Sequence, residues 1–589
     1  MGVTPSILPN AVRVSSIFDY RVKGTSARSV IVTESSCFGR NARPRHTRVL
    51  MRTTMKRFWK WFFYTIVPLT GVLLWHLLGF RHPTTDPIDV SINSMSVPQY
   101  GVAELNIRHT DSAFVNVWDG PSISASFISP AGQKFLVSGF YHSKGLWKTR
   151  FSPPETGTWR WTVEWRDGSG IQNAKGVLEA SKGGTGPVRR HPQNAFRLVF
   201  ADGSLYPAIG IGDCITGPSA GSMRWGFDGE LRPSSDHHGG STTDIDTYLS
   251  AYSRAGFNVF RWSVDSCSFK LWDRVEPSGN VYLEAEGKRG DDLVIKLREY
   301  GFHVYMVLFN RPLYPTDASD PAKMDAIKRY VKYVVARYGA YVDFWELMNE
   351  SDAEDKWYSI VASYIRSIDP YAHLISTSNP RPDLSVIEIN SPHWYQKEDE
   401  FSSDTVTIEK IQNAKAAAQK PVIFGEQGNS GQNWDERSAL RMRIRSWTAF
   451  FNEGFLIFWN SSFAKDYRAD AANIYLGPQE RSYIANLQAF AKSIDSDVRI
   501  APITVSPATE VNGYALSSSQ MFAAYLHNHR DHMNPTRGTS IQIQIPQKGV
   551  AYWYSPETGT TLPGLTLSAG PHTLQVPPFF IDIALICRR

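Results

Sequence analysis

The sequence predicts an α/β protein in which a (β/α)8 barrel is flanked by two small antiparallel β-sandwich domains and preceded by one transmembrane helix. Strands and amphipathic helical stretches alternate between residues 184 and 496, as in a parallel sheet with crossover helices. Short alternating runs broken by Gly and Pro fill residues 99–183 and 497–589, which is typical of antiparallel sandwiches. An uncharged apolar run stands at residues 61–80.

Length and charge bound the class of protein. A chain of 589 residues has room for roughly three or four domains, and its 42% hydrophobic and 20% charged residues are ordinary for folded proteins. The formal net charge is +6, but residues 1–60 alone hold 12 Lys and Arg against 2 Asp and Glu, so the remaining residues have a net charge of −4. The positive charge belongs to the tail, and we expect no nucleic-acid partner. The oligomeric state is left open.

The N-terminal region predicts a membrane anchor. Residues 1–60 are basic and aperiodic, and we expect a disordered cytoplasmic tail. The apolar run at residues 61–80 has roughly the 20 residues that a membrane helix needs. Basic residues crowd its N-terminal side and Asp86 and Asp89 lie beyond it, so the positive-inside rule places the rest of the chain in the periplasm or outside the cell. A cleaved signal peptide is the alternative; no small-x-small cleavage site follows the run, which favours an uncleaved anchor.

A linker and a first sandwich follow. Residues 81–98 are rich in Pro, Asp and Ser and are interpreted as a linker. Residues 99–183 alternate apolar and polar side chains, most clearly at Trp159–Trp165, and predict the N-terminal β-sandwich.

The predicted barrel occupies residues 184–496. Its eight expected strands are Tyr206–Gly212, Asn258–Ser263, His303–Phe309, Val342–Met348, His373–Ser378, Val386–Asn390, Pro421–Gly425 and Phe455–Asn460. Amphipathic stretches between them are Asp244–Ala255, Asp291–Tyr300, Asp325–Tyr338 and Ala439–Asn452.

The second sandwich is predicted at residues 497–589. Its expected strands are Met521–Leu526, Ser540–Ile545, Val550–Tyr554, His572–Val576 and Ile581–Ile586.

The four cysteines, Cys37, Cys214, Cys267 and Cys587, form no Cys-x-x-Cys or Cys/His cluster, so we expect no structural zinc site. Cys214 and Cys267 follow two neighbouring predicted strands. A disulfide between them and a pair of free, partly buried thiols are both open.

Polar side chains gather where the predicted barrel strands end, which is the rim on which barrels build active sites. Two of them are glutamic acids, one after strand 4 and one after strand 7. The full set of candidates is Glu350, Glu426, Arg261, Asn349, His393, Tyr395, Trp459, Asp213 and Asn310.

A pair of carboxyl groups is what glycoside cleavage needs. One protonates the leaving oxygen, and the other attacks the anomeric carbon or activates a water molecule. Arg261 can keep the attacking carboxylate ionised, although it could instead be a structural partner of Glu346. Asn349 can bind a sugar 2-hydroxyl, and Trp459 offers a flat apolar surface to a sugar ring. His393 could equally be a buried structural histidine. The chemistry calls for no cofactor and no metal.

Asn349-Glu350 after strand 4, Glu426 after strand 7, Arg261, His393-x-Tyr395 and Trp459 together resemble the pattern of the clan A glycoside hydrolases. The resemblance implies a retaining (β/α)8 hydrolase with Glu350 as acid/base and Glu426 as nucleophile. On this basis we expect Glu426 to be ionised and Glu350 to be protonated in the resting enzyme.

The flanking regions extend the resemblance. Gly139–Tyr141 and Trp147–Phe151 resemble the sandwich that precedes apiosidase-like barrels, and Trp553-Tyr554 with Pro577–Phe579 resembles a collagen-binding-like C-terminal β domain. In such barrels an Asp-Thr-Ala-Trp stretch usually follows the first strand, but here it reads Asp213-Cys214-Ile215-Thr216, which leaves the sugar specificity open.

Two other functions use the same features. One is a catalytically inactive carbohydrate-binding or scaffolding protein, against which the presence of both acids argues. The other is a transglycosylase, which would share every catalytic residue. Two Asn-x-Ser sequons, at Asn349 and Asn460, fall on the site, and glycosylation would block it, which favours a bacterial source. The expected partner is a polysaccharide or oligosaccharide.

Overall fold

The computed structural model describes residues 87–111, 114–212, 223–225, 231–233, 245–265, 270–310, 318–396, 398–428, 437–459 and 476–589. The predicted anchor at residues 61–80, Asp213 and the pair Cys214 and Cys267 lie outside the described residues. Within the part that is described, no helix is long and apolar enough to cross a bilayer.

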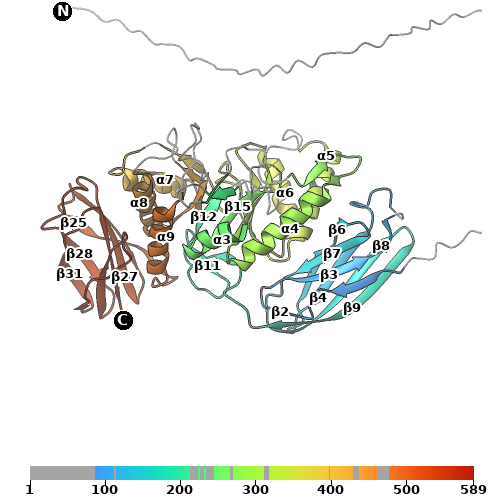
Figure 1. The fold of residues 1–589 in the computed structure, drawn as a ribbon, viewed down its shortest axis with the longest axis horizontal. Coiled ribbons are helices and arrows are strands. Elements are labelled where there is room, and N and C mark those ends of the chain that lie inside the picture. The colour runs from blue at the N-terminus through green and yellow to red at the C-terminus, as the bar shows by residue number, and fades with distance from the viewer. Residues whose placement is uncertain are drawn as a thin grey trace, which may run out of the picture. The chain divides into compact units, whose positions relative to one another are not determined.

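Eight parallel strands form the central sheet, which we call the barrel sheet (Figure 1). Its spatial order is β20-β19-β18-β15-β12-β23-β22-β21, so the first strand in the chain, β12, lies between the second and the last. In this order sequence neighbours pair and the first strand lies beside the last, as in a (β/α)8 barrel, but β20 and β21 form the two edges of the sheet and are not paired with each other. The strands are β12 (Ile209–Gly212), β15 (Val259–Ser263), β18 (His303–Phe309), β19 (Val342–Met348), β20 (Leu374–Ser376), β21 (His393–Tyr395), β22 (Val422–Gly428) and β23 (Gly454–Trp459).

Helices connect most of these strands, as the amphipathic stretches predict. They are α3 (Ile245–Arg254), α4 (Glu284–Glu299), α5 (Pro321–Tyr338), α6 (Asp355–Ile368), α7 (Ser403–Ala417), α8 (Ser438–Phe451) and α9 (Pro478–Ala491). Asp320 caps α5 by accepting hydrogen bonds from the backbone N–H groups of Ala322 and Lys323. Two-stranded ribbons, β10 (Val188–Arg190) with β11 (Leu198–Phe200), β13 (Met223–Trp225) with β14 (Leu231–Pro233), and β16 (Trp272–Arg274) with β17 (Val281–Tyr282), also lie between residues 188 and 282.

The prediction for the sixth strand is wrong. Val386–Asn390 is not a strand. The strand β21 starts at His393, three residues after Asn390. Residues 388–390 still bridge the two ends of the sheet: the N–H of Glu388 donates to the carbonyl of Ile375, and the N–H of Asn390 donates to that of Pro421. Pro392 has no N–H to donate, so a regular ladder cannot run through it. The strand therefore begins after the proline.

Two mainly antiparallel sheets precede the barrel sheet, in the blue to cyan part of Figure 1. One has the order β1-β3-β7-β6, with β1 (Asp89–Ile92), β3 (Ala103–Arg108), β6 (Phe140–Ser143) and β7 (Leu146–Phe151). The other has the order β2-β9-β8-β4-β5, with β2 (Ser96–Pro98), β4 (Ser122–Ile128), β5 (Lys134–Ser138), β8 (Gly157–Asp167) and β9 (Gly170–Ser181).

The alternation in β8 buries Trp159, Trp161 and Trp165 in the core of this first region, as predicted. The expected linker at residues 81–98 contains two strands instead. β1 adds to the edge of one sheet and β2 pairs in parallel with β9 of the other, the only parallel pairing among the described strands of these two sheets. Their runs of three and four residues are too short for a periodic pattern to reveal.

Two antiparallel sheets follow the barrel sheet. The six-stranded sheet has the order β24-β26-β27-β32-β29-β30, and the three-stranded sheet has the order β25-β28-β31. Their strands are β24 (Arg499–Ala501), β25 (Thr504–Ser506), β26 (Val511–Ser517), β27 (Met521–Asn528), β28 (Ser540–Ile545), β29 (Gly549–Tyr554), β30 (Leu565–Leu567), β31 (Gly570–Gln575) and β32 (Asp582–Arg588). The mixed α/β class with flanking antiparallel sheets is therefore confirmed.

Candidate active site

The ladders of the barrel sheet set several site residues beside their strand neighbours. Gly212 pairs with Arg261 on one side and with Trp459 on the other, and His393 pairs with Glu426. A Cβ atom at residue 212 would lie 2.9 Å from the ring of Trp459. Glycine at the end of β12 therefore leaves the space that the tryptophan ring fills.

Glu426, on β22, is a buried carboxyl group with two strong donors. Nη1 of Arg261 donates to its Oε1 at 2.7 Å, and the hydroxyl of Tyr395 donates to its Oε2. Burial and the adjacent Glu426 raise the pKa of Tyr395 far above its ordinary value, so this hydroxyl keeps its proton. Because both neighbours donate, they fix the orientation of the Glu426 carboxyl group.

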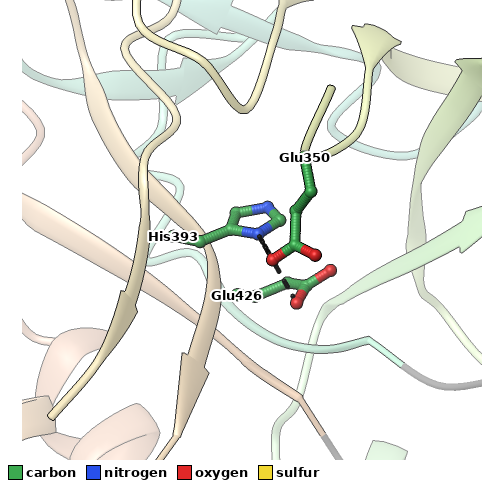
Figure 2. Close-up of side chains that lie close together, drawn as sticks. All are labelled: Glu350, His393 and Glu426. Atoms are coloured by element: carbon green, nitrogen blue, oxygen red, sulfur yellow. Dashed lines mark hydrogen bonds and ion pairs between the residues drawn. The ribbon is translucent and has the colours of Figure 1, made fainter. Parts of the chain in front are cut away.

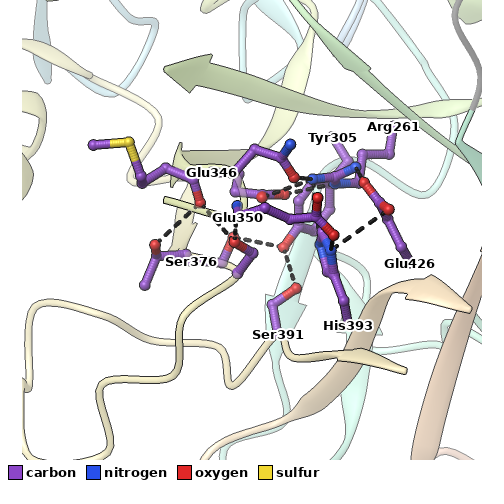
Figure 3. A network of polar contacts seen from close by, with 12 residues as sticks. Arg261, Tyr305, Glu346, Glu350, Ser376, Ser391, His393 and Glu426 are labelled. Carbon is purple, nitrogen blue, oxygen red and sulfur yellow. Dashed lines mark hydrogen bonds and ion pairs between the residues drawn. The ribbon is translucent and has the colours of Figure 1, made fainter. Parts of the chain in front are cut away.

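The sequence left open whether Arg261 binds Glu426 or is a structural partner of Glu346, and in the structure it contacts both (Figure 3). Its Nε and Nη2 donate to the two oxygens of Glu346 at 2.6 and 2.8 Å, while Nη1 holds Glu426. Burial alone lowers the pKa of Arg261, but Glu346 and Glu426 outweigh it and raise the pKa. Glu346 thus fixes a permanent positive charge beside Glu426.

The carboxyl groups of Glu350 and Glu426 lie close to each other, with the ring of His393 beside both, as Figure 2 shows. Its backbone has φ = 43°, a left-handed conformation that few residues other than glycine adopt. Its N–H donates to Oγ of Ser378 at 2.6 Å. One oxygen of Glu350, one oxygen of Glu426 and a ring nitrogen of His393 all lie within 4.8 Å of one another.

Our expectation that Glu350 is protonated in the resting site does not hold in this geometry. Nδ1 of His393 lies 2.9 Å from Oε1 of Glu350, and this hydrogen bond lowers the pKa of Glu350 despite the opposing effect of partial burial. Glu350 is more than half exposed, whereas Glu426 is buried. Exposure weakens the repulsion from Glu426 on which the expectation rested.

Asn349 has its amide oriented from both sides. Its Oδ1 accepts from Nη2 of Arg261 at 2.7 Å, and its Nδ2 donates to Oδ1 of Asn310 at 3.0 Å. A primary amide can be turned over by 180° at little cost unless both ends are engaged. Because both ends are engaged here, Nδ2 of Asn349 faces Asn310 and Oδ1 faces Arg261.

These residues surround a pocket of about 420 Å³. It is lined by Arg261, Trp262, Ser263, Val307, Asn310, Asn349, Glu350, Tyr395, Glu426 and Trp459. Every described member of the predicted site lines it except His393, whose Nδ1 contacts both acids. Asp213 lies outside the described residues.

The cluster of Glu350, His393 and Glu426 could offer three ligand atoms to a metal ion. A cation there would share Glu426 with the guanidinium of Arg261, 2.7 Å from the same carboxylate. Two adjacent positive charges repel each other, so the donor set suits a hydrogen-bonded acid pair better than a metal centre.

Sequence reasoning missed two residues of this neighbourhood. Ser378 holds the backbone of Glu350, and Asp265 accepts a hydrogen bond from the backbone N–H of Asn310 at 2.7 Å. Ser378 is the last residue of a predicted strand, so strand-end position was a usable signal. Asp265 lies two residues past β15, and no motif marks it.

Comparisons with known proteins give one matching family model and several solved structures that align with this chain. Residues 96–166 match the family model described as a domain of unknown function (DUF5060). No curated protein matches the sequence. The crystal structure of a candidate glycoside hydrolase from Bacteroides vulgatus ATCC 8482 aligns over 84% of this chain and 100% of that one, with a TM-score of 0.55 and 14% identity.

A GH30 endoxylanase from Clostridium papyrosolvens C71 aligns over 58% of this chain and 93% of its own, with a TM-score of 0.39 and 13% identity. That likeness is too distant to argue from. The likeness to the Bacteroides protein shows a shared fold.

Proposed function

We propose that this protein is a retaining glycoside hydrolase that cleaves O-glycosidic bonds in a polysaccharide or oligosaccharide, with a (β/α)8 catalytic barrel. The observation that carries the proposal is the pair of carboxyl groups at the pocket, with one oxygen of Glu350 and one of Glu426 within 4.8 Å of each other. Retaining enzymes hold their two carboxyl groups about 5–5.5 Å apart, and inverting enzymes about 6.5–9.5 Å apart.

In the first step, Oε of Glu426 attacks the anomeric carbon while the bond to the leaving oxygen breaks. Glu350 gives its proton to that oxygen, so a glycosyl ester of Glu426 and a free alcohol result. In the second step, Glu350 takes a proton from water, and the water oxygen displaces Glu426. Arg261 and Tyr395 stabilise the carboxylate as it leaves.

The acid step requires that Glu350 carry a proton when substrate is bound. In the free site, His393 lowers its pKa. Because the Glu350 side chain is mostly exposed, it can turn from His393 toward a glycosidic oxygen. The bound sugar then excludes water from the site. This loss of solvation raises the pKa of Glu350, so that Glu350 can act as an acid.

The anomeric outcome tests the mechanism. Proton NMR of wild-type hydrolysis should show product with the starting anomeric configuration, and net inversion would falsify the retaining role of Glu426. With azide present, Glu350→Ala should yield a glycosyl azide of retained configuration and Glu426→Ala one of inverted configuration.

Two alternatives share this site. A transglycosylase would transfer the glycosyl group to an added sugar acceptor rather than to water, which product analysis distinguishes. An inactive carbohydrate-binding protein would bind oligosaccharides without releasing any reducing end. Both acids line one pocket, which argues against the inactive binding protein, and the acceptor assay separates the hydrolase from the transglycosylase.

We also propose that residues 61–80 anchor the protein in a membrane, with the tail in the cytoplasm and the catalytic part outside. The full chain should then sediment with membranes, and a chain that starts near residue 84 should not. If expression of the full sequence instead yields a soluble product whose N-terminus lies beyond residue 80, the segment is a cleaved signal.

A further inference from the structure

A buried carboxyl group that the proposed mechanism does not use lies beside the pocket. Asp265 follows β15 and has only 4% of its surface exposed. Its Oδ2 accepts from the backbone N–H of Asn310 at 2.7 Å, and its Oδ1 accepts from Nε1 of Trp272 at 2.7 Å. Both of these partners are donors that cannot reverse their role.

Asn310 passes this contact on to the site. It directly follows β18, and its Oδ1 accepts from Nδ2 of Asn349, whose Oδ1 accepts from Arg261. A continuous chain of hydrogen bonds therefore runs from Asp265 to the residue that precedes Glu350. The chain links the ends of strands β15, β18 and β19, which are neighbours in the barrel sheet.

We infer that Asp265 is a positioning residue for recognition of the sugar 2-hydroxyl, acting through Asn310 on Asn349. Asp265 fixes the backbone of Asn310 and thereby positions its side-chain Oδ1. This oxygen accepts from Nδ2 of Asn349 and holds the NH2 group toward the pocket. One of the two N–H bonds of that group goes to Asn310, and the second is directed to a substrate hydroxyl. The inference rests on the proposed function, because it assigns Asn349 to a substrate contact.

Asp265→Asn tests the chain without changing the size of the side chain. Asn310 and Trp272 donate to different oxygens of Asp265, and an amide has an NH2 group in place of one of them, so in this geometry it can accept from only one of the two donors. The lost hydrogen bond should reduce kcat/KM roughly tenfold on the 4-nitrophenyl glycoside that the wild type hydrolyses. On the matching 2-deoxy glycoside, which lacks the hydroxyl that Asn349 binds, the reduction should be less than twofold, roughly.

Trp272→Phe provides the matched control and the rescue. Alone it removes one donor and leaves Asn310 held, so kcat/KM should stay near that of the wild type. In Asp265→Asn/Trp272→Phe the amide oxygen can turn to Asn310, because the competing donor is gone. The double variant should therefore recover most of the activity that Asp265→Asn loses.

Equal losses on the two substrates, or no rescue in the double variant, would overturn the inference while leaving the hydrolase proposal standing. If the wild type hydrolyses no glycoside, the proposed function fails, and NMR still decides the positioning role. In the full chain labelled with ¹⁵N-asparagine, the side-chain amide signal of Asn349, assigned by its loss in Asn349→Asp, should shift in Asp265→Asn and return in the double variant. A signal that does not move would rule out the chain of hydrogen bonds from Asp265 to Asn349.

Discussion

At the scale of single residues, the site depends on a few side chains that hold the two acids in place. Glu426 is fixed by Arg261 and Tyr395 from within the barrel sheet. Glu350 is fixed less by its side chain than by its backbone, which has positive φ and a hydrogen bond to Ser378. Strained backbone at a functional residue persists only when its neighbours hold it.

Ser378→Ala should therefore lower kcat by roughly tenfold with little change in KM, because the bond from the Glu350 N–H is lost and the acid is misplaced. Steady-state kinetics measures this. Thr377→Val is the control: Thr377 and Ser378 both donate to the carbonyl of Met348, but only Ser378 accepts from Glu350. Similar losses in the two variants would show that the contact with Met348, not Glu350, matters.

His393 should set the pH dependence of the free enzyme. Its hydrogen bond lowers the pKa of Glu350, and kcat/KM falls as pH rises through the pKa of the acid in the free enzyme. His393→Phe removes this bond, so the falling limb of the pH profile of kcat/KM should move to higher pH. Trp394→Phe, a neighbouring ring that packs on Phe424, should leave the limb in place. A limb that moves to lower pH contradicts this role.

At the scale of elements, one buried ion cluster joins the first antiparallel sheets to the barrel helices. Asp291 on α4 binds Arg150 of β7 at 2.8 Å and Arg337 of α5 at 2.7 Å, and all three are buried. Nη1 of Arg150 also donates to the backbone carbonyl of Arg337 at 2.6 Å. Burial alone raises the pKa of Asp291, but the two arginines outweigh it and hold the pKa well below its ordinary value.

Asp291→Asn should lower the free energy of unfolding by about 3–5 kcal/mol near neutral pH, because Arg337 loses its buried counter-charge and Arg150 keeps only Glu104 as an ion-pair partner. Urea denaturation followed by circular dichroism measures the loss. Glu164→Gln, which breaks an exposed pair with Arg166, is the control and should change the value by about 0.5 kcal/mol or less.

The same cluster predicts a pH dependence. The folded pKa of Asp291 lies below the unfolded value of about 3.9, so its stabilisation is complete above about pH 5 and is lost as pH falls through the folded pKa. The difference in stability between wild type and Asp291→Asn should shrink below pH 4. A difference that stays constant down to pH 2 would rule out Asp291 as the titrating group.

At the scale of the whole molecule, the barrel helices and the six-stranded C-terminal sheet share one hydrophobic core. Trp447 of α8 is fully buried and stacks on Tyr525 of β27 with ring centroids 5.5 Å apart. Arg443 of the same helix pairs with Asp582 of β32, and the core includes Ala584 and residues of α9. These two regions should therefore unfold together.

Trp447→Ala tests this coupling. Loss of the indole should destabilise the protein by about 3–5 kcal/mol. Hydrogen exchange should then become faster to a similar extent in peptides from β27 and from β22. Tyr552→Ala, which trims an exposed side chain on β29, is the control and should change neither. Faster exchange in β27 alone would show that the C-terminal sheets unfold independently.

The sequence predicted the elements whose pattern is local. Val342–Met348 and His303–Phe309 have the expected bounds, because long apolar runs between turn signals identify buried strands. The short strands β1 and β2 were assigned to a linker, and Val386–Asn390 was taken as the sixth strand. In these segments the outcome depends on partners far along the chain, such as β9 and β22, which no local pattern reveals.

Strand ends likewise made Glu350, Glu426, Arg261, His393, Tyr395 and Trp459 predictable as a group, since parallel strands deliver their carboxyl ends to one edge. Only the tertiary structure decided the contacts within the group. It gave Arg261 two carboxylate partners, set His393 against Glu350 and thereby lowered the pKa of that acid, and placed Asp265 and Ser378 behind the site. Hydrogen-bond partners and pKa shifts depend on distances of a few ångströms between strands that are up to 165 residues apart in the chain, and a linear sequence does not contain those distances.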